Sequence, residues 1–93
     1  MDPRIKELAH SLVHFSTKLQ PKERVLIEAV GIDALPLLEA LIEETYAAGA
    51  YPTARLKDSR LNRQTLLGAT EESLAFEADI ALAHMKGMDA YIG

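Results

Sequence analysis

Residues 24–30, Arg-Val-Leu-Ile-Glu-Ala-Val, form a short run in which apolar and partly β-branched side chains follow one another almost without interruption. Such a run is typical of a strand that is covered on both faces, as in the middle of a parallel sheet. Parallel neighbours need crossover connections, and these are usually helices. The run therefore predicts an α/β fold with this strand at its centre.

The segments before and after this strand contain helix-capping residues and the apolar spacing of helices. Helix starts are predicted where Asp2, Asp33, Asp58 and Thr70 can accept hydrogen bonds from free backbone amides. Glycines at positions 49, 68 and 87 supply the matching stops. The predicted elements are a helix over 3–19, a strand over 24–30, a helix up to Gly49, a strand over 51–57, a short helix up to Gly68, a helix up to Gly87 and a strand over 89–92.

Apolar spacing predicts which face of each helix is buried. The first helix carries a stripe with steps of 3 and 4 residues, as do the second and the last. The predicted stripes are Ile5, Leu8, Leu12, Phe15 and Leu19; Leu35, Leu38, Leu41, Ile42 and Tyr46; and Leu74, Ala78, Ala81 and Met85. In the central strand we expect Val25, Ile27 and Ala29 on one face and Leu26 and Val30 on the other.

The order of the elements gives the fold class: α/β, a small parallel β-sheet with helices on both faces. Three strands are few for this class, and the chain of 93 residues reaches Gly93 directly after the third strand. We therefore expect residues 1–93 to form a single truncated domain, a fragment of a longer chain.

Charge and composition exclude several classes of function. Ten Lys and Arg stand against fourteen Asp and Glu, and this net charge of −4 opposes nucleic-acid binding. The absence of cysteine excludes disulfides, thiolate metal sites and a cysteine nucleophile. The polar start and the lack of an apolar run of about 18 residues predict neither a signal peptide nor a membrane span. We expect a cytoplasmic protein that binds no membrane.

The residues that most resemble metal ligands are Glu7, His10 and His14, whose spacing places them on one face of the first helix. At about 100° per residue, that face lies more than about 90° from the predicted apolar stripe. It is therefore predicted to face solvent, where nothing would orient the ligands. His84 stands alone near the end of the last helix and is predicted to cap carbonyl groups or to be exposed.

The turn after the central strand is the place where a doubly wound fold binds phosphate. Gly31 is its single glycine and Asp33 is anionic, so neither a glycine-rich fingerprint nor a phosphate-binding loop is present. Glu28 interrupts the apolar strand near its carboxyl end, where ligands bind in open sheets. We expect Glu28 to pair with Arg55 or Arg24, or to be exposed at the end of the sheet.

A polar cluster on the short helix could hold a carboxylate or a phosphate, yet a solvated helix face is the simpler interpretation. Its members are Arg60, Asn62, Arg63 and Gln64. No Ser-His-Asp grouping follows a nucleophile-elbow sequence. The residues therefore predict no catalytic, cofactor-binding or metal-binding residue in this chain.

Several phrases, taken in order, carry a family resemblance. They are residues 24–31 (RVLIEAVG), 34–38 (ALPLL), 46–52 (YAAGAYP), 67–72 (LGATEE) and 85–92 (MKGMDAYI). In this register they resemble the N-terminus of the thermophilic-type metalloaminopeptidases, the family of aminopeptidase T and aminopeptidase S. The resemblance spans essentially all 93 residues.

The resemblance implies a cytoplasmic enzyme that removes N-terminal residues from peptides with two divalent metal ions, zinc, cobalt or similar. It implies metal ligands in a separate C-terminal catalytic domain, and no position here matches them. We then expect residues 1–93 to be the non-catalytic N-terminal domain, inactive alone, shaping the substrate cavity or a homo-oligomer. One alternative is a small-ligand-binding or regulatory module using the sheet edge near Glu28, Gly31 and Asp58. The other is a purely structural oligomerisation domain.

Overall fold

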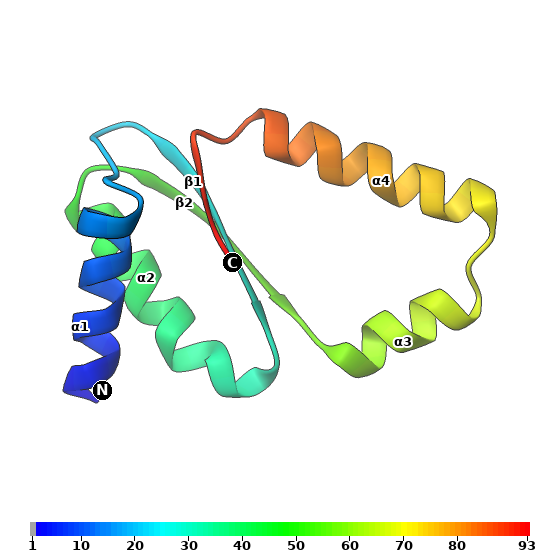
Figure 1. Cartoon of the computed structure of the whole chain (residues 1–93), viewed down its shortest axis with the longest axis horizontal. Coiled ribbons are helices and arrows are strands. Elements are labelled where there is room, and N and C mark those ends of the chain that lie inside the picture. The colour runs from blue at the N-terminus through cyan, green and yellow to red at the C-terminus, as the bar shows by residue number, and fades with distance from the viewer. Residues whose placement is uncertain (1) are drawn as a thin grey trace.

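The computed structural model describes residues 2–93 and has a three-stranded parallel sheet with helices beside it (Figure 1). The strand order is β2-β1-β3, which confirms both the α/β class and the central position of β1. The elements are α1 (Pro3–Ser11), the π-helix η1 (Leu12–Ser16), β1 (Arg24–Val30), the 3₁₀ turn η2 (Ile32–Ala34), α2 (Leu35–Ala47), β2 (Tyr51–Lys57), α3 (Ser59–Leu67), α4 (Glu71–Lys86) and β3 (Ala90–Ile92).

The two edge strands differ in how much of β1 they cover. β2 pairs with β1 along its whole length, whereas β3 pairs only with residues 25–27. Asp89 anchors the start of β3: its backbone N–H donates to the Arg24 carbonyl at 2.7 Å, and its carboxylate accepts from the Arg24 backbone N–H at 2.8 Å. That N–H, helped by the Arg24 guanidinium, holds the pKa of Asp89 below its usual range. These bonds fix the position of β3 on the sheet.

Three of the four predicted helix caps are confirmed. The side chains of Asp2, Asp58 and Thr70 each accept a hydrogen bond from a backbone N–H two or three residues further on. The prediction for Asp33 is wrong. Gly31 adopts a φ of 90°, and the chain then forms the 3₁₀ turn η2, so Asp33 lies inside a turn and does not cap α2.

α1 and α2 lie on one side of the sheet and form the core with it (Figure 1). The buried residues come from both helices, from β1 and from the ends of the neighbouring segments. They are Ala9, Val13, Leu19, Val25, Ile27, Leu38, Ala40, Leu41, Ala50 and Ile92. Within β1, Leu26 is also buried, but Val30 is 65% exposed, so the prediction that Val30 is covered is wrong.

The predicted stripe of the first helix is wrong in two positions. Leu8 and Phe15 are exposed, and the fully buried residues are Ala9 and Val13. The predicted single helix is divided at Leu12, where the α-helix gives way to a π-helix with more residues per turn. The small side chain of Ala9 lets a neighbouring element approach closely. The buried face is therefore turned toward the histidines by about one residue step.

The second helix follows its predicted stripe only in the middle. Leu38 and Leu41 are buried, whereas Leu35 and Tyr46 at the two ends are exposed. Thr45 is fully buried, and its hydroxyl donates to the Leu41 carbonyl at 2.7 Å. This bond satisfies the buried hydroxyl within the helix, so a polar residue can occupy the core face at no loss of a hydrogen bond.

α3 and α4 lie on the other side of the sheet (Figure 1) and contain no buried residue. A cavity of about 350 Å³ separates α4 from β2, with Arg55 and Lys57 on one wall and Phe76 and Ile80 on the other. The predicted stripe of α4 is thus not buried: Leu74 and Met85 remain 45% and 41% exposed. None of the helices described over residues 2–93 is both long enough and apolar enough to cross a membrane.

Candidate functional site

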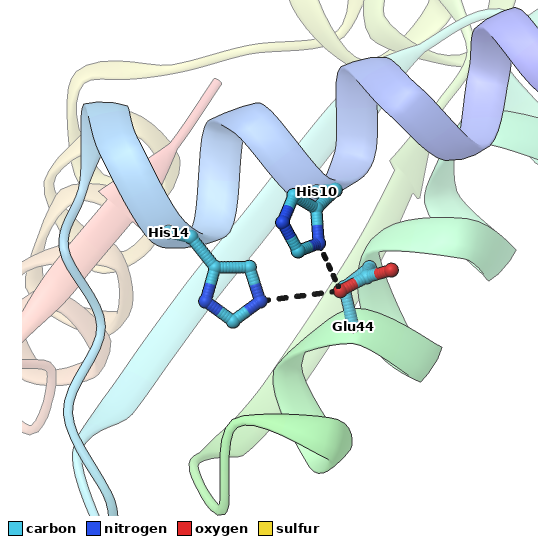
Figure 2. A group of neighbouring side chains, drawn as sticks. All are labelled: His10, His14 and Glu44. Carbon is cyan, nitrogen blue, oxygen red and sulfur yellow. Dashed lines mark hydrogen bonds and ion pairs between the residues drawn. The ribbon is translucent and has the colours of Figure 1, made fainter.

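One group of potential metal ligands lies between the two helices of the core side. His10 and His14 point from the first helical segment toward Glu44 of α2 (Figure 2). His10 Nδ1 and His14 Nε2 each lie 3.3 Å from the same oxygen, Glu44 Oε2. We call these three residues the His–His–Glu cluster. The two imidazole rings are close neighbours, with centroids 4.2 Å apart and planes inclined by 39°.

The placement of the histidines follows from the face that α1 and η1 bury. Ala9 and Val13 are fully buried, and each histidine is the next residue along the helix, which places it beside the buried face and next to α2. Thr17 closes the segment: its hydroxyl donates to the carbonyls of Leu12 and Val13 at 2.8 and 3.0 Å. These bonds hold the last turn of η1, which carries His14.

Glu44 is fixed in a similar way on α2. Its neighbour Thr45 is fully buried, and Leu41, one turn earlier, is 3% exposed. These two residues fix the rotation of α2 about its axis, so that Glu44 emerges at the border of the core on the side of α1. Its side chain is 26% exposed. The carboxylate thus lies in a partly dry position, where its interactions are stronger than at the open surface.

The structure changes the predicted ligand set in two ways. Glu7 is exposed and does not belong to the cluster, and its place is taken by Glu44. The prediction that this helix face points to solvent is wrong for His14, whose side chain is only 33% exposed. The error follows from the misplaced stripe, because the buried face lies closer to the histidines than the spacing of the large residues indicated.

Glu28 pairs with a cation, as one of the predicted alternatives required, but the cation is neither Arg55 nor Arg24. The Lys57 ammonium lies 2.8 Å from Glu28 Oε2 and holds the pKa of this carboxyl below its usual value of 4.5. Arg24 is engaged by Asp89 instead. Because the Glu28 charge is already matched, this carboxylate has little capacity left to bind a ligand.

The remaining candidates lie at the carboxyl edge of the sheet, on α3 and on α4. A cavity of about 290 Å³ lies at the carboxyl edge of β1 and β2, with Val30, Asp58 and Asn62 in its wall. The Asp58 carboxylate there already caps α3. Arg60, Asn62, Arg63 and Gln64 lie on an exposed helix, and His84 is half-buried. Within residues 2–93, the His–His–Glu cluster is the one group of three such ligands that meets in space.

Comparison with known proteins identifies a family and a solved structure to which the chain is similar. The family model described as "Thermophilic metalloprotease (M29)" matches residues 1–92. Among solved structures, wild-type AmpT from Thermus thermophilus matches with a TM-score of 0.60 and 28% sequence identity. That match covers 75% of this chain and 18% of the AmpT chain. No curated protein matches the sequence.

Proposed function

The chain belongs to the thermophilic metalloprotease family M29, and from this we propose that it forms the N-terminal, non-catalytic domain of a metal-dependent aminopeptidase. Such an enzyme removes N-terminal residues from peptides. The observation that carries the proposal is the family match over residues 1–92, in a chain that aligns with only 18% of the AmpT chain. The peptide substrate and the activity belong to the whole enzyme.

The metal chemistry proposed for the whole enzyme does not fit the residues of this domain. A pair of divalent ions that activates water and polarises a peptide carbonyl needs ligands for both ions and an enclosed site. The His–His–Glu cluster offers three ligand atoms on a surface where the side chain of His10 is 55% exposed. We therefore propose that the two ions, zinc, cobalt or similar, are bound outside residues 2–93.

The exposed apolar residues of α3 and α4 support a role in shaping a larger assembly. These two helices leave eight large apolar side chains at least two-fifths exposed, and exposed apolar residues in such number favour an interaction site. The residues are Leu61, Leu66, Leu67, Leu74, Phe76, Ile80, Leu82 and Met85. We propose that the catalytic domain, or a second copy in a homo-oligomer, covers them and that this domain borders the substrate cavity.

Charge and composition support proposals for the cellular location and the binding partners of the enzyme. A chain with no cysteine is suited to a reducing compartment, and we place the enzyme in the cytoplasm. The net charge of −4 disfavours nucleic acid as a partner.

The alternative function, a small-ligand-binding or regulatory module, would use the cavity at the carboxyl edge of β1. It is less favoured, because Glu28 and Asp58 there are engaged by Lys57 and by the α3 backbone.

The 93-residue chain alone is expected to lack peptidase activity, because the one ligand cluster found in residues 2–93 cannot hold a metal pair in an enclosed site. The measurement is hydrolysis of an aminoacyl chromogenic substrate in the presence of Zn²⁺, Co²⁺ or Mn²⁺, with metal and substrate alone as the control. Only the background rate is expected. Metal-dependent turnover that disappears in His14→Gln would show that the cluster is catalytic. It would overturn the proposal that this domain is non-catalytic.

A further inference from the structure

We propose that the His–His–Glu cluster is a binding site for one divalent transition-metal ion, Zn²⁺ above all, with His10 Nδ1, His14 Nε2 and Glu44 Oε2 as protein ligands and water in the fourth position. The site is separate from the metal pair that we propose above to be bound outside residues 2–93. It rests only on the geometry of three side chains in this chain and does not depend on the proposed enzymatic function.

The distances between the ligand atoms carry the proposal. With zinc–nitrogen and zinc–oxygen bonds of about 2.0–2.2 Å and tetrahedral angles, two ligands of one ion lie about 3.3–3.5 Å apart. Both imidazole nitrogens lie 3.3 Å from Glu44 Oε2. A hydrogen bond from N–H to oxygen is usually shorter, about 2.9–3.0 Å. The two separations are long for hydrogen bonds and match the spacing of two ligands of one ion.

The distance between His10 Nδ1 and His14 Nε2 also has to suit a single ion. All three ligand atoms lie within 4.8 Å of one another. The histidines are four residues apart, the spacing that places two imidazoles one above the other on a helix. Rotation of the His10 side chain, which is 55% exposed, can bring its Nδ1 closer to His14 Nε2 without disturbing the core.

The ligand types select the metal. Two imidazoles and one carboxylate are the donors preferred by zinc and its neighbours in the first transition series, whereas Mg²⁺ and Ca²⁺ prefer oxygen donors alone. No thiolate can compete, because the sequence contains no cysteine. In addition, a bound divalent ion would replace the two 3.3 Å contacts between the imidazoles and Glu44 Oε2 by direct metal–ligand bonds. We expect Zn²⁺ to bind and Mg²⁺ not to bind in the same range of concentration.

The ion would connect two helices that are far apart in the sequence. His14 and Glu44 are separated by 30 residues, so a bound ion crosslinks the first helical segment to α2. Because the unfolded chain does not hold the three ligands together, binding stabilises the folded state. The melting temperature should therefore rise with Zn²⁺ concentration, by about 10 °C or more at a hundredfold excess over the dissociation constant.

The test is titration of the metal-free 93-residue chain with Zn²⁺, followed by calorimetry and by NMR of the histidine ring protons. His84 lies outside the cluster and serves as the internal control. One ion per chain is expected, with the His10 and His14 signals shifting together and the His84 signals unchanged. Absence of binding, or equal shifts of all three histidines, would overturn the proposal.

Matched variants identify the ligands. His14→Gln and Glu44→Gln keep a polar side chain of similar size, and each should weaken Zn²⁺ binding at least about tenfold, as loss even of an outer partner of a metal ligand does. Glu7→Gln, on the same helix but outside the cluster, should bind as the parent chain does. Equal affinity in all three variants would assign the ion to another place. If a cluster variant does not fold, the NMR result on the unaltered chain decides.

Discussion

Replacing Ile27 with Ala is expected to lower the free energy of unfolding by about 2–5 kcal/mol. Ile27 lies in the central strand, is fully buried and has Ala54 and Ile92 as its neighbours in the sheet. Removing its outer carbon atoms leaves a cavity between a hydrogen-bonded sheet and the helices packed on it, and such a site relaxes only partly. The loss is a large share of the total for a domain of this size. Equilibrium unfolding in urea, followed by circular dichroism, measures it.

Val30→Ala is the matched control. Val30 belongs to the same strand but is 65% exposed, so its truncation should change the free energy of unfolding by no more than about 0.5 kcal/mol. A loss below about 1 kcal/mol for Ile27→Ala would place Ile27 in the range of surface residues. Such a result would contradict the core described for the α1–α2 side of the sheet.

Amide hydrogen exchange in the 93-residue chain is expected to be at least about 100-fold slower in β1 than in α4, a difference of about 2.7 kcal/mol in opening free energy. Val25, Leu26 and Ile27 are at most 2% exposed and have strand partners on both sides. By contrast, α4 has no buried residue to hold it, and a helix of 16 residues alone is only marginally stable in water.

The same experiment on the longer polypeptide proposed above supplies the control. If the catalytic domain or a second copy covers α3 and α4, the amides of α4 should gain protection there while those of β1 change little. Equal protection of α4 and β1 in the 93-residue chain would show that α4 is already packed, and the argument for a covering partner would fail.

The fold was predictable wherever the pattern is local. The apolar run of β1 predicts the central strand. The helix caps at Asp2, Asp58 and Thr70 are predictable because each capping hydrogen bond spans only two or three residues. The apolar stripe of the first helix was not readable. Its buried face includes Ala9, which allows close packing because its side chain is small. It also depends on the π-helix η1, which the spacing of large apolar side chains does not predict.

The cluster was only half predictable for a related reason. The spacing of His10 and His14 is a local signal and was seen in the sequence. Glu44 is not local: it comes from a helix beyond β1 and reaches the histidines only because Leu41 and Thr45 fix the rotation of α2. The sequence does show that Glu44 lies on the border of the apolar stripe of α2. Which side chains Glu44 contacts, however, depends on how α1 and α2 pack against each other.

The measurement that tests the central claim most directly is purification of the native polypeptide that contains residues 1–93, with its mass and its peptidase activity determined on the same sample. We expect a polypeptide several times heavier than 10.2 kDa, assembled from more than one copy, that releases N-terminal residues from peptides only when divalent metal is present. A native polypeptide of 10.2 kDa, or a long one that stays inactive with zinc, cobalt and manganese, would contradict the assignment to a metal-dependent aminopeptidase.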